Sequence, residues 1–145
     1  MREIKFRAWD KVNKAFMSSE EFAIHDGDVM GLRYGNEMDD VLTDQVELMQ
    51  YTGLKDINGV EMFDGDVVEV NIQEYVLGYY TETKYTSLIR YKDGSYYFDI
   101  LKSETIQTDI NDYPLKDIIN LEDVESDDCE VIGNKFENPE LLEVD

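Results

Sequence analysis

Three carboxylates near the middle of the chain are the residues whose types and spacing could do chemistry. Asp56, Asp64 and Asp66 lie close together in the sequence, and neighbouring carboxylates can act as a general acid and base or bind a hard cation. Each of them also stands in a sequence typical of a turn, where an Asp side chain binds nearby backbone N–H groups. We therefore predict that turn formation accounts for all three.

The single histidine and the single cysteine add no second reactive group. His25 alternates with Phe22 and Ile24, which predicts a solvent-facing position on a short strand. Cys129 stands among acidic residues, which raise a thiol pKa, so we predict a buried structural thiol. The sequence thus predicts no catalytic, cofactor-binding or metal-binding residue. Whether the protein is an enzyme is left open, and the non-enzymatic interpretation is favoured.

Two further groups of residues could bind a ligand. Residues 122–128, E-D-V-E-S-D-D, are dense in carboxylates but lack the glycine and ligand spacing of a calcium loop, which favours a solvated loop. Seven tyrosines between Tyr75 and Tyr97 could form a stacking platform for bases or sugars. Tyrosine is also a strong strand former, and we favour this explanation because no basic groove accompanies the tyrosines.

The net charge of −21 narrows the classes of partner. Residues 103–145 contain 14 acidic and 2 basic residues and carry more than half of the imbalance. Direct binding of nucleic acid is disfavoured, because phosphates are neutralised by clustered Lys and Arg. An acidic surface can instead keep a protein soluble, attract a basic partner, or imitate the charge of DNA towards a DNA-binding protein.

Short strands and turns must position these groups. Residues 2–9 alternate apolar and polar side chains, and with residues 15–18 they predict a hairpin that has Trp9 at the edge of the core. Residues 30–46 follow no period and predict a variable loop or a lobe boundary.

The central stretch 47–72 has the densest turn signals. We predict a strand at 48–51, a break at Thr52-Gly53, two reversals, and an alternating strand at 67–72, a pattern common at the opening of small SH3-like barrels. The predicted turn residues here are Gly53, Asn58, Gly59, Asp64, Gly65 and Asp66.

Downstream, residues 85–91 and 95–101 read as a hairpin, whereas 73–84 reads as a long, partly paired excursion. Residues 103–128 stay ambiguous between helix, strand and loop. Near the end, we predict a turn at Gly133-Asn134 and a short helix with Asn138 at its N-cap and Pro139 as its first residue. The sequence therefore predicts a mainly β chain, α+β at most, with an N-terminal β-hairpin region, an SH3-like barrel-type antiparallel sheet and short helices. We expect a single domain, 1–145, with 1–46 and 47–145 as alternative sub-lobes.

Three sequence blocks resemble a known family. They are R-E-I-K-F-R-A-W-D at the start, L-M-Q-Y-T-G-L-K-D-I-N-G-V-E-M-F-D-G-D-V-V in the centre, and V-I-G-N-K-F-E-N-P-E-L-L near the end. In content and order they resemble the YopX family, small proteins found mostly in bacteriophages and prophages of Gram-positive bacteria. The resemblance implies a phage-derived cytoplasmic protein that is largely β with a barrel-like portion. It carries over no activity, cofactor or site residue.

Three hypotheses of function follow from these features. The first is an uncharacterised phage or prophage accessory protein that acts as a non-enzymatic interaction module on a host or phage protein. The second is an acidic DNA mimic that occupies a host DNA-binding protein, and the third is an enzyme on a small substrate. We expect a cytoplasmic protein in the bacterial host, since the apolar runs are too short to span a bilayer and one cysteine cannot form an internal disulfide. Homo-oligomerisation through strand edges is left open. The loops at 30–46, 73–84 and 122–128 are the expected places for function.

Overall fold

The computed structural model describes residues 4–18, 20–32, 38–111 and 113–143. The chain forms two compact units, Met1–Tyr51 and Thr52–Asp145. Strand β6 (Val46–Lys55) runs from one unit into the other, so the boundary falls inside a strand rather than before residue 47. The chain is mainly β, and the helices among its described residues are short 3-10 turns, which confirms the predicted fold class.

The first unit contains the predicted N-terminal hairpin. Strands β1 (Phe6–Asp10) and β2 (Ala15–Met17) pair antiparallel, and β6 pairs along the other side of β1. Trp9 is buried and meets the ring of Phe16 edge-on at 4.9 Å between centroids, as expected for the edge of a core. The Asp10 carboxylate accepts hydrogen bonds from the N–H groups of Val12 and Asn13, which closes the loop of the hairpin.

A second small sheet in this unit corrects the prediction of a loop at 30–46. Strands β3 (Phe22–His25), β4 (Asp28–Leu32) and β5 (Met38–Val41) pair antiparallel in that order. The part of the predicted loop at 33–37 lies outside the described residues. Within this segment the end of β4 at 30–32 and the whole of β5 were missed, because each piece is short and carries no sustained alternation.

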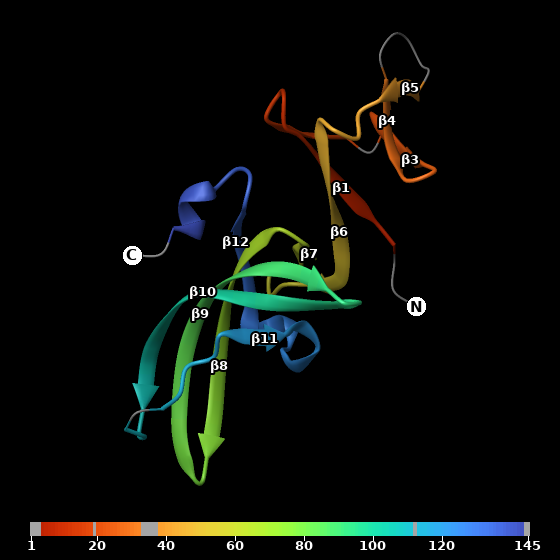
Figure 1. The fold of residues 1–145 in the computed structure, drawn as a ribbon. Coiled ribbons are helices and arrows are strands. Elements are labelled where there is room, and N and C mark those ends of the chain that lie inside the picture. The colour runs from red at the N-terminus through yellow and green to blue at the C-terminus, as the bar shows by residue number, and fades with distance from the viewer. Residues whose placement is uncertain (1–3, 19, 33–37, 112, 144–145) are drawn as a thin grey trace. The chain divides into compact units, whose positions relative to one another are not determined.

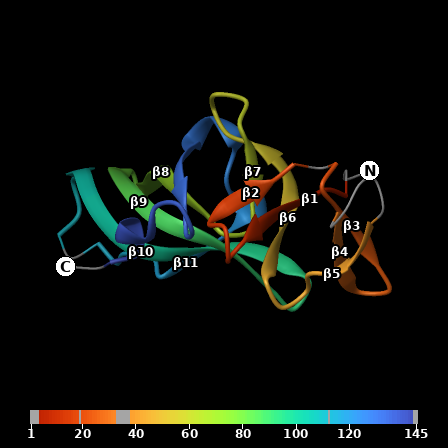
Figure 2. The same ribbon diagram turned by 90° about the horizontal axis from the view of Figure 1, so that it is seen from above.

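The second unit is built on a five-stranded antiparallel sheet with the order β11-β10-β9-β8-β12. Its strands are β8 (Asp66–Val76), β9 (Tyr79–Lys92), β10 (Ser95–Thr108), β11 (Ile118–Asn120) and β12 (Cys129–Asn134). The long strands curl into a half-barrel (Figures 1 and 2), which confirms the barrel-type antiparallel sheet. The expected excursion at 73–84 is a regular continuation of β8 and β9, which pair residue by residue up to a turn at Leu77-Gly78.

The core of the second unit lies against one face of this sheet. Val68 and Val70 of β8, Tyr85 and Ile89 of β9, and Phe98 of β10 are all fully buried. At the Leu77-Gly78 turn the large apolar side chains become exposed, among them those of Tyr75, Leu77 and Tyr79. The sheet is therefore anchored at one end and reaches into solvent at the other.

Two predicted turn glycines lie inside strands instead. Gly53 has a φ of 91° within β6, where the Thr52 hydroxyl accepts from the N–H of Leu54 and donates to the carbonyl of Met62 in β7 (Glu61–Phe63). The kink is therefore satisfied locally, and the strand continues. Gly133 lies beside a bulge in β12, where a Cβ atom would come within 2.5 Å of Asn138 Oδ1.

The C-terminal turn is made by asparagines in roles other than those predicted. Asn134 Oδ1 accepts from the N–H groups of Phe136 and Glu137, at 3.0 and 2.8 Å. Asn138 precedes the 3-10 helix η3 (Pro139–Leu142), which begins with proline as expected, but its side chain accepts from Asn134 N–H instead of capping η3. The side chain of Asn138 thus fastens the chain next to the bulge instead of the start of η3.

The Asp56 carboxylate ties the central turn to β12. Asp56 is 5% exposed; its Oδ1 accepts from the N–H groups of Asn58 and Val60, at 2.9 and 2.8 Å, and its Oδ2 accepts from Val131 N–H at 2.8 Å. Gly59, with a φ of 80°, completes the turn. This carboxylate therefore serves the backbone.

We predict that Asp56→Ala lowers the free energy of unfolding by about 2–3 kcal/mol, because three N–H groups lose a charged acceptor. Urea unfolding followed by circular dichroism measures the change. Glu122→Ala, at an exposed position, is the control and should shift stability by less than about 0.5 kcal/mol. An Asp56→Ala midpoint equal to that of the control would contradict the assignment.

Candidate functional site: two pockets beside strand β8

Two pockets of the second unit lie beside β8, and the larger of these two opens along residues 72–74. It has a volume of about 480 Å³ and combines the side of β8 at residues 72–74 with β11, Lys116, and the 3-10 helices η1 (Leu121–Asp123) and η2 (Ser126–Asp128). Its apolar part is supplied by Ile72, Ile118, Ile119 and Val124.

A hydrogen-bonded group of three side chains fixes one wall of this pocket. The Tyr113 hydroxyl donates to Glu74 Oε2, and Lys116 Nζ lies 3.3 Å from Glu74 Oε1. The hydrogen bond from Tyr113 and the charge of Lys116 lower the pKa of Glu74, and the same hydrogen bond raises the pKa of Tyr113. Lys116 N–H also donates to the hydroxyl of Tyr85, at 3.3 Å. The segment at 113–116 is thus held against the sheet at two points.

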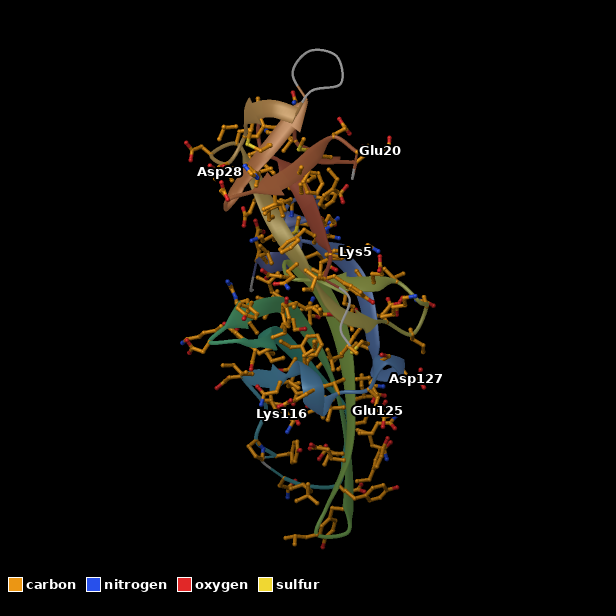
Figure 3. All side chains as sticks on the ribbon, turned by 90° about the vertical axis from the view of Figure 1, so that its right-hand side faces the viewer. Lys5, Glu20, Asp28, Lys116, Glu125 and Asp127 are labelled. Atoms are coloured by element: carbon orange, nitrogen blue, oxygen red, sulfur yellow. The ribbon has the colours of Figure 1, made fainter. Side chains whose placement is uncertain are left out.

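The larger pocket is also lined by acidic side chains. Asp123, Glu125 and Asp128 line it and are exposed. Figure 3 shows Lys116 and Glu125 with their side chains, together with Asp127 of the same acidic segment. Since Lys116 is already paired with Glu74, the three exposed carboxylates give the pocket a net negative charge.

A smaller pocket lies beside the same strand. It has a volume of about 180 Å³ and is lined by Ile57, Glu69, Asn71, Lys84 and residues 127–130. Glu69 and Asn71 alternate along β8 with Ile72 and Glu74 of the larger pocket, so these side chains lie on opposite faces of the sheet. Asp128 contributes to both pockets.

The smaller pocket also contains a shielded acceptor. The Asn71 amide nitrogen donates to Glu82, whereas Asn71 Oδ1 is buried and has no donor among the described residues. The acidic side chains that line the smaller pocket are Glu69, Asp127, Asp128 and Glu130, and its basic side chain is Lys84. Both pockets therefore present more negative than positive charge.

Cys129 lines the smaller pocket but is not suited to nucleophilic chemistry. It is buried, and burial together with the charges of Asp128 and Asp56 raises its thiol pKa to about 12. The thiolate is the reactive form, so this cysteine stays protonated near neutral pH. The predicted burial of this thiol is confirmed.

The residues singled out in the sequence occupy other places. Asp56 and Asp66 are both buried, and both bind turn backbone rather than each other. Asp66 is the first residue of β8, and its Oδ2 accepts from Phe63 N–H at 2.8 Å across the reversal. Gly65, with a φ of 94°, donates its N–H to the carbonyl of Ile89. His25 is exposed on β3, as predicted.

Across the described ranges, no group of three or more His, Cys, Asp or Glu side chains could hold a metal ion. No helix in these ranges has the length and apolar character needed to cross a bilayer.

The tyrosines do not form one stacking platform. Tyr85 and Tyr96 are buried in the core, whereas Tyr75 and Tyr80 pair across the hairpin at 5.3 Å between ring centroids. This agrees with their role as strand formers. Sequence reasoning pointed to 122–128 and 73–84 but missed Tyr113 and Lys116, which carry no local signal and reach β8 only through the fold.

A family model described as YopX protein matches residues 5–143. The chain belongs to the YopX family. Its fold is similar to the crystal structure of protein EF1440 from Enterococcus faecalis, with a TM-score of 0.57, 25% sequence identity, and coverage of 99% of this chain and 100% of that chain. A search of curated proteins finds no match. Family membership and the solved structure establish the fold, and neither assigns a reaction.

The contacts of Glu74 predict an acid-dependent loss of stability. Because the pKa of Glu74 is lower in the folded protein than in the unfolded chain, its contribution is fully present above the unfolded-state pKa and is lost as the pH falls through the folded-state pKa. We predict that Glu74→Gln reduces this acid-dependent decrease. Thermal unfolding at a series of pH values from about 6 to about 3 measures it.

Glu104→Gln, at an exposed position of β10, is the matched control and should keep the pH profile of the unmodified chain. Identical profiles for Glu74→Gln and the unmodified chain would show that Tyr113 and Lys116 do not favour the ionised form of Glu74.

Proposed function

We propose that this YopX-family protein is a non-enzymatic interaction module that binds a basic segment of a partner protein at the two pockets beside β8. The observation that carries the proposal is the negative charge of both pockets, which lie on opposite faces of one strand and share Asp128. An acidic site of this kind attracts Lys and Arg side chains and repels nucleic acid.

The ionisable groups of the pockets support binding rather than proton transfer. An efficient general acid or base has a pKa near the working pH. The pKa of Glu74 is lowered and that of Tyr113 is raised, so both move away from neutrality, and the Cys129 thiol is protonated. These groups hold fixed charges and hydrogen bonds, which suits a recognition surface.

The shape of the larger pocket supports a basic side chain as its occupant. Lys and Arg place an apolar stem against hydrophobic surface and keep their charged end near polar groups. Here Ile72 and Val124 offer the apolar contact, and Glu125 and Asp128 offer the carboxylates. We place the module in the cytoplasm of a bacterial host, with a host or phage protein as its partner, because the family resemblance implies a phage-derived protein.

Charge reversal at the shared wall tests the proposal. The probe is a capped peptide of about eight residues with two basic side chains, labelled for fluorescence anisotropy. We predict that Glu125→Lys/Asp128→Lys weakens binding by about tenfold or more, since two rim carboxylates become cations. Higher ionic strength should weaken binding to the unmodified chain.

The control variant is Glu20→Lys/Glu104→Lys, which changes the net charge equally at exposed positions away from the pockets. It should retain most of the affinity. Equal losses in the two variants would mean that the peptide responds only to the overall charge of the chain, and the proposed site would be wrong.

A further inference from the structure

Strand β8 has an open edge between the two pockets. Its neighbour β12 pairs only with Asp66–Val70, whereas β8 continues to Val76 (Figure 1). Among the described residues, no strand pairs with the outer side of β8 beyond Val70. An edge of this kind presents unpaired N–H and C=O groups, which can accept a further strand.

The hydrogen bonds of β12 show which backbone groups face this edge. Val131 N–H donates to Asp56, and Cys129 C=O accepts from Ile57 N–H, so the backbone groups of these two residues point away from β8. Their partners in the ladder are Val68 and Val70. In an antiparallel pair both residues point their groups towards each other or both point away, so Val68 and Val70 direct theirs towards β9.

Along β8 the backbone groups of successive residues point alternately towards β9 and towards the outer edge. This alternation continues to Val76, because the pairing of β8 with β9 has no register shift from Val67 to Val76. Asn71, Gln73 and Tyr75 therefore direct their N–H and C=O groups towards the open edge. Strand β9 gives the same assignment for Tyr75. Tyr80 lies opposite Tyr75, and its C=O accepts from Asp109 N–H on the side away from β8. The edge thus offers three regularly spaced pairs of donors and acceptors.

We propose that an extended segment of the partner protein adds to β8 along Asn71, Gln73 and Tyr75, and that two adjacent basic residues of this segment enter the two pockets. Successive side chains of a strand point to opposite faces, so neighbouring residues reach the larger and the smaller pocket respectively. This inference rests on the proposed function and names the partner as a segment with a Lys/Arg pair in extended conformation. Strand addition then supplies affinity through the backbone, and the pockets supply specificity.

The charges of both pockets favour this occupant. On the face of the larger pocket the segment meets Asp123, Glu125 and Asp128, and on the other face it meets further carboxylates. A basic side chain in the smaller pocket also brings a donor close to Asn71, whose Oδ1 lacks one among the described residues. An acidic or purely apolar segment gains none of these contacts.

A proline substitution tests the backbone part of the proposal. Gln73→Pro removes an N–H that faces the open edge and leaves the hydrogen bonds to β9 intact, and proline is tolerated at such positions of edge strands. Gln73→Ala is the matched control, because both variants lose the side-chain hydrogen bond to Glu82 and only one loses the N–H. The probe is a capped peptide of about eight residues with adjacent Lys and Arg, the Lys-Arg peptide. We predict that Gln73→Pro weakens its binding by about tenfold, and that Gln73→Ala weakens it by less than about threefold. Thermal unfolding checks that both variants fold.

Peptide spacing tests the pocket part on the unmodified chain. Two capped peptides of about eight residues have the same threonine, valine, lysine and arginine content, with the basic residues either adjacent or separated by one valine. We predict that the adjacent pair binds about tenfold more tightly, since separated residues point to the same face.

Three outcomes separate the claims. Loss of binding in Gln73→Pro and a preference for the adjacent pair support strand addition. Strand addition is overturned if Gln73→Pro and Gln73→Ala bind the peptide equally, or if the two peptides bind the unmodified chain with equal affinity. The proposed function then survives if Glu125→Lys/Asp128→Lys still loses binding. If charge reversal at the pockets has no effect either, the proposed function fails as well.

Discussion

The buried carboxylate of Asp56 is the interaction on which the arrangement around β8 depends. It closes the turn at 56–60 and holds the N–H of Val131, so one side of β12 is occupied by the turn and the other by β8. Because Ile57 N–H binds Cys129 C=O at the first residue of the strand, β12 begins there and the acidic 3-10 segment precedes it. Past Val70 no described strand pairs with the outer edge of β8, and a pocket lies on each face.

A second fixed contact shapes the larger pocket. Residues 113–116 follow the long strand β10 and would otherwise have little reason to lie on the sheet. The hydrogen bond from Tyr113 to Glu74 and the ion pair of Lys116 hold them there, and Tyr85 in the core accepts a further hydrogen bond from Lys116 N–H. Glu74 is thus neutralised by the protein itself, and the charge left for a ligand comes from Asp123, Glu125 and Asp128.

The sequence predicted the features that depend on neighbours along the chain. Alternation identified β1, the end of β8 nearest the core and the hairpin of β9 and β10, and the turn residues Asn58-Gly59 and Asp64-Gly65-Asp66 were placed by local hydrogen-bonding chemistry. Gly53 and Gly133 were assigned to turns because glycine is favoured both in chain reversals and in bulges or kinks of a strand, and the sequence does not distinguish the two. The pockets could not be predicted, since Glu74 comes together with Lys116 and Asp128 only when the sheet has formed.

Amide hydrogen exchange in the presence of the Lys-Arg peptide tests strand addition most directly. In the free chain, the N–H groups of Ile72 and Glu74 should be protected by β9, whereas those of Asn71, Gln73 and Tyr75 should exchange rapidly. Binding of the peptide should slow exchange at Asn71, Gln73 and Tyr75 and leave Ile72 and Glu74 nearly unchanged. Protection confined to residues 123–128, with rapid exchange still at Gln73 and Tyr75, would contradict the addition of a strand to β8.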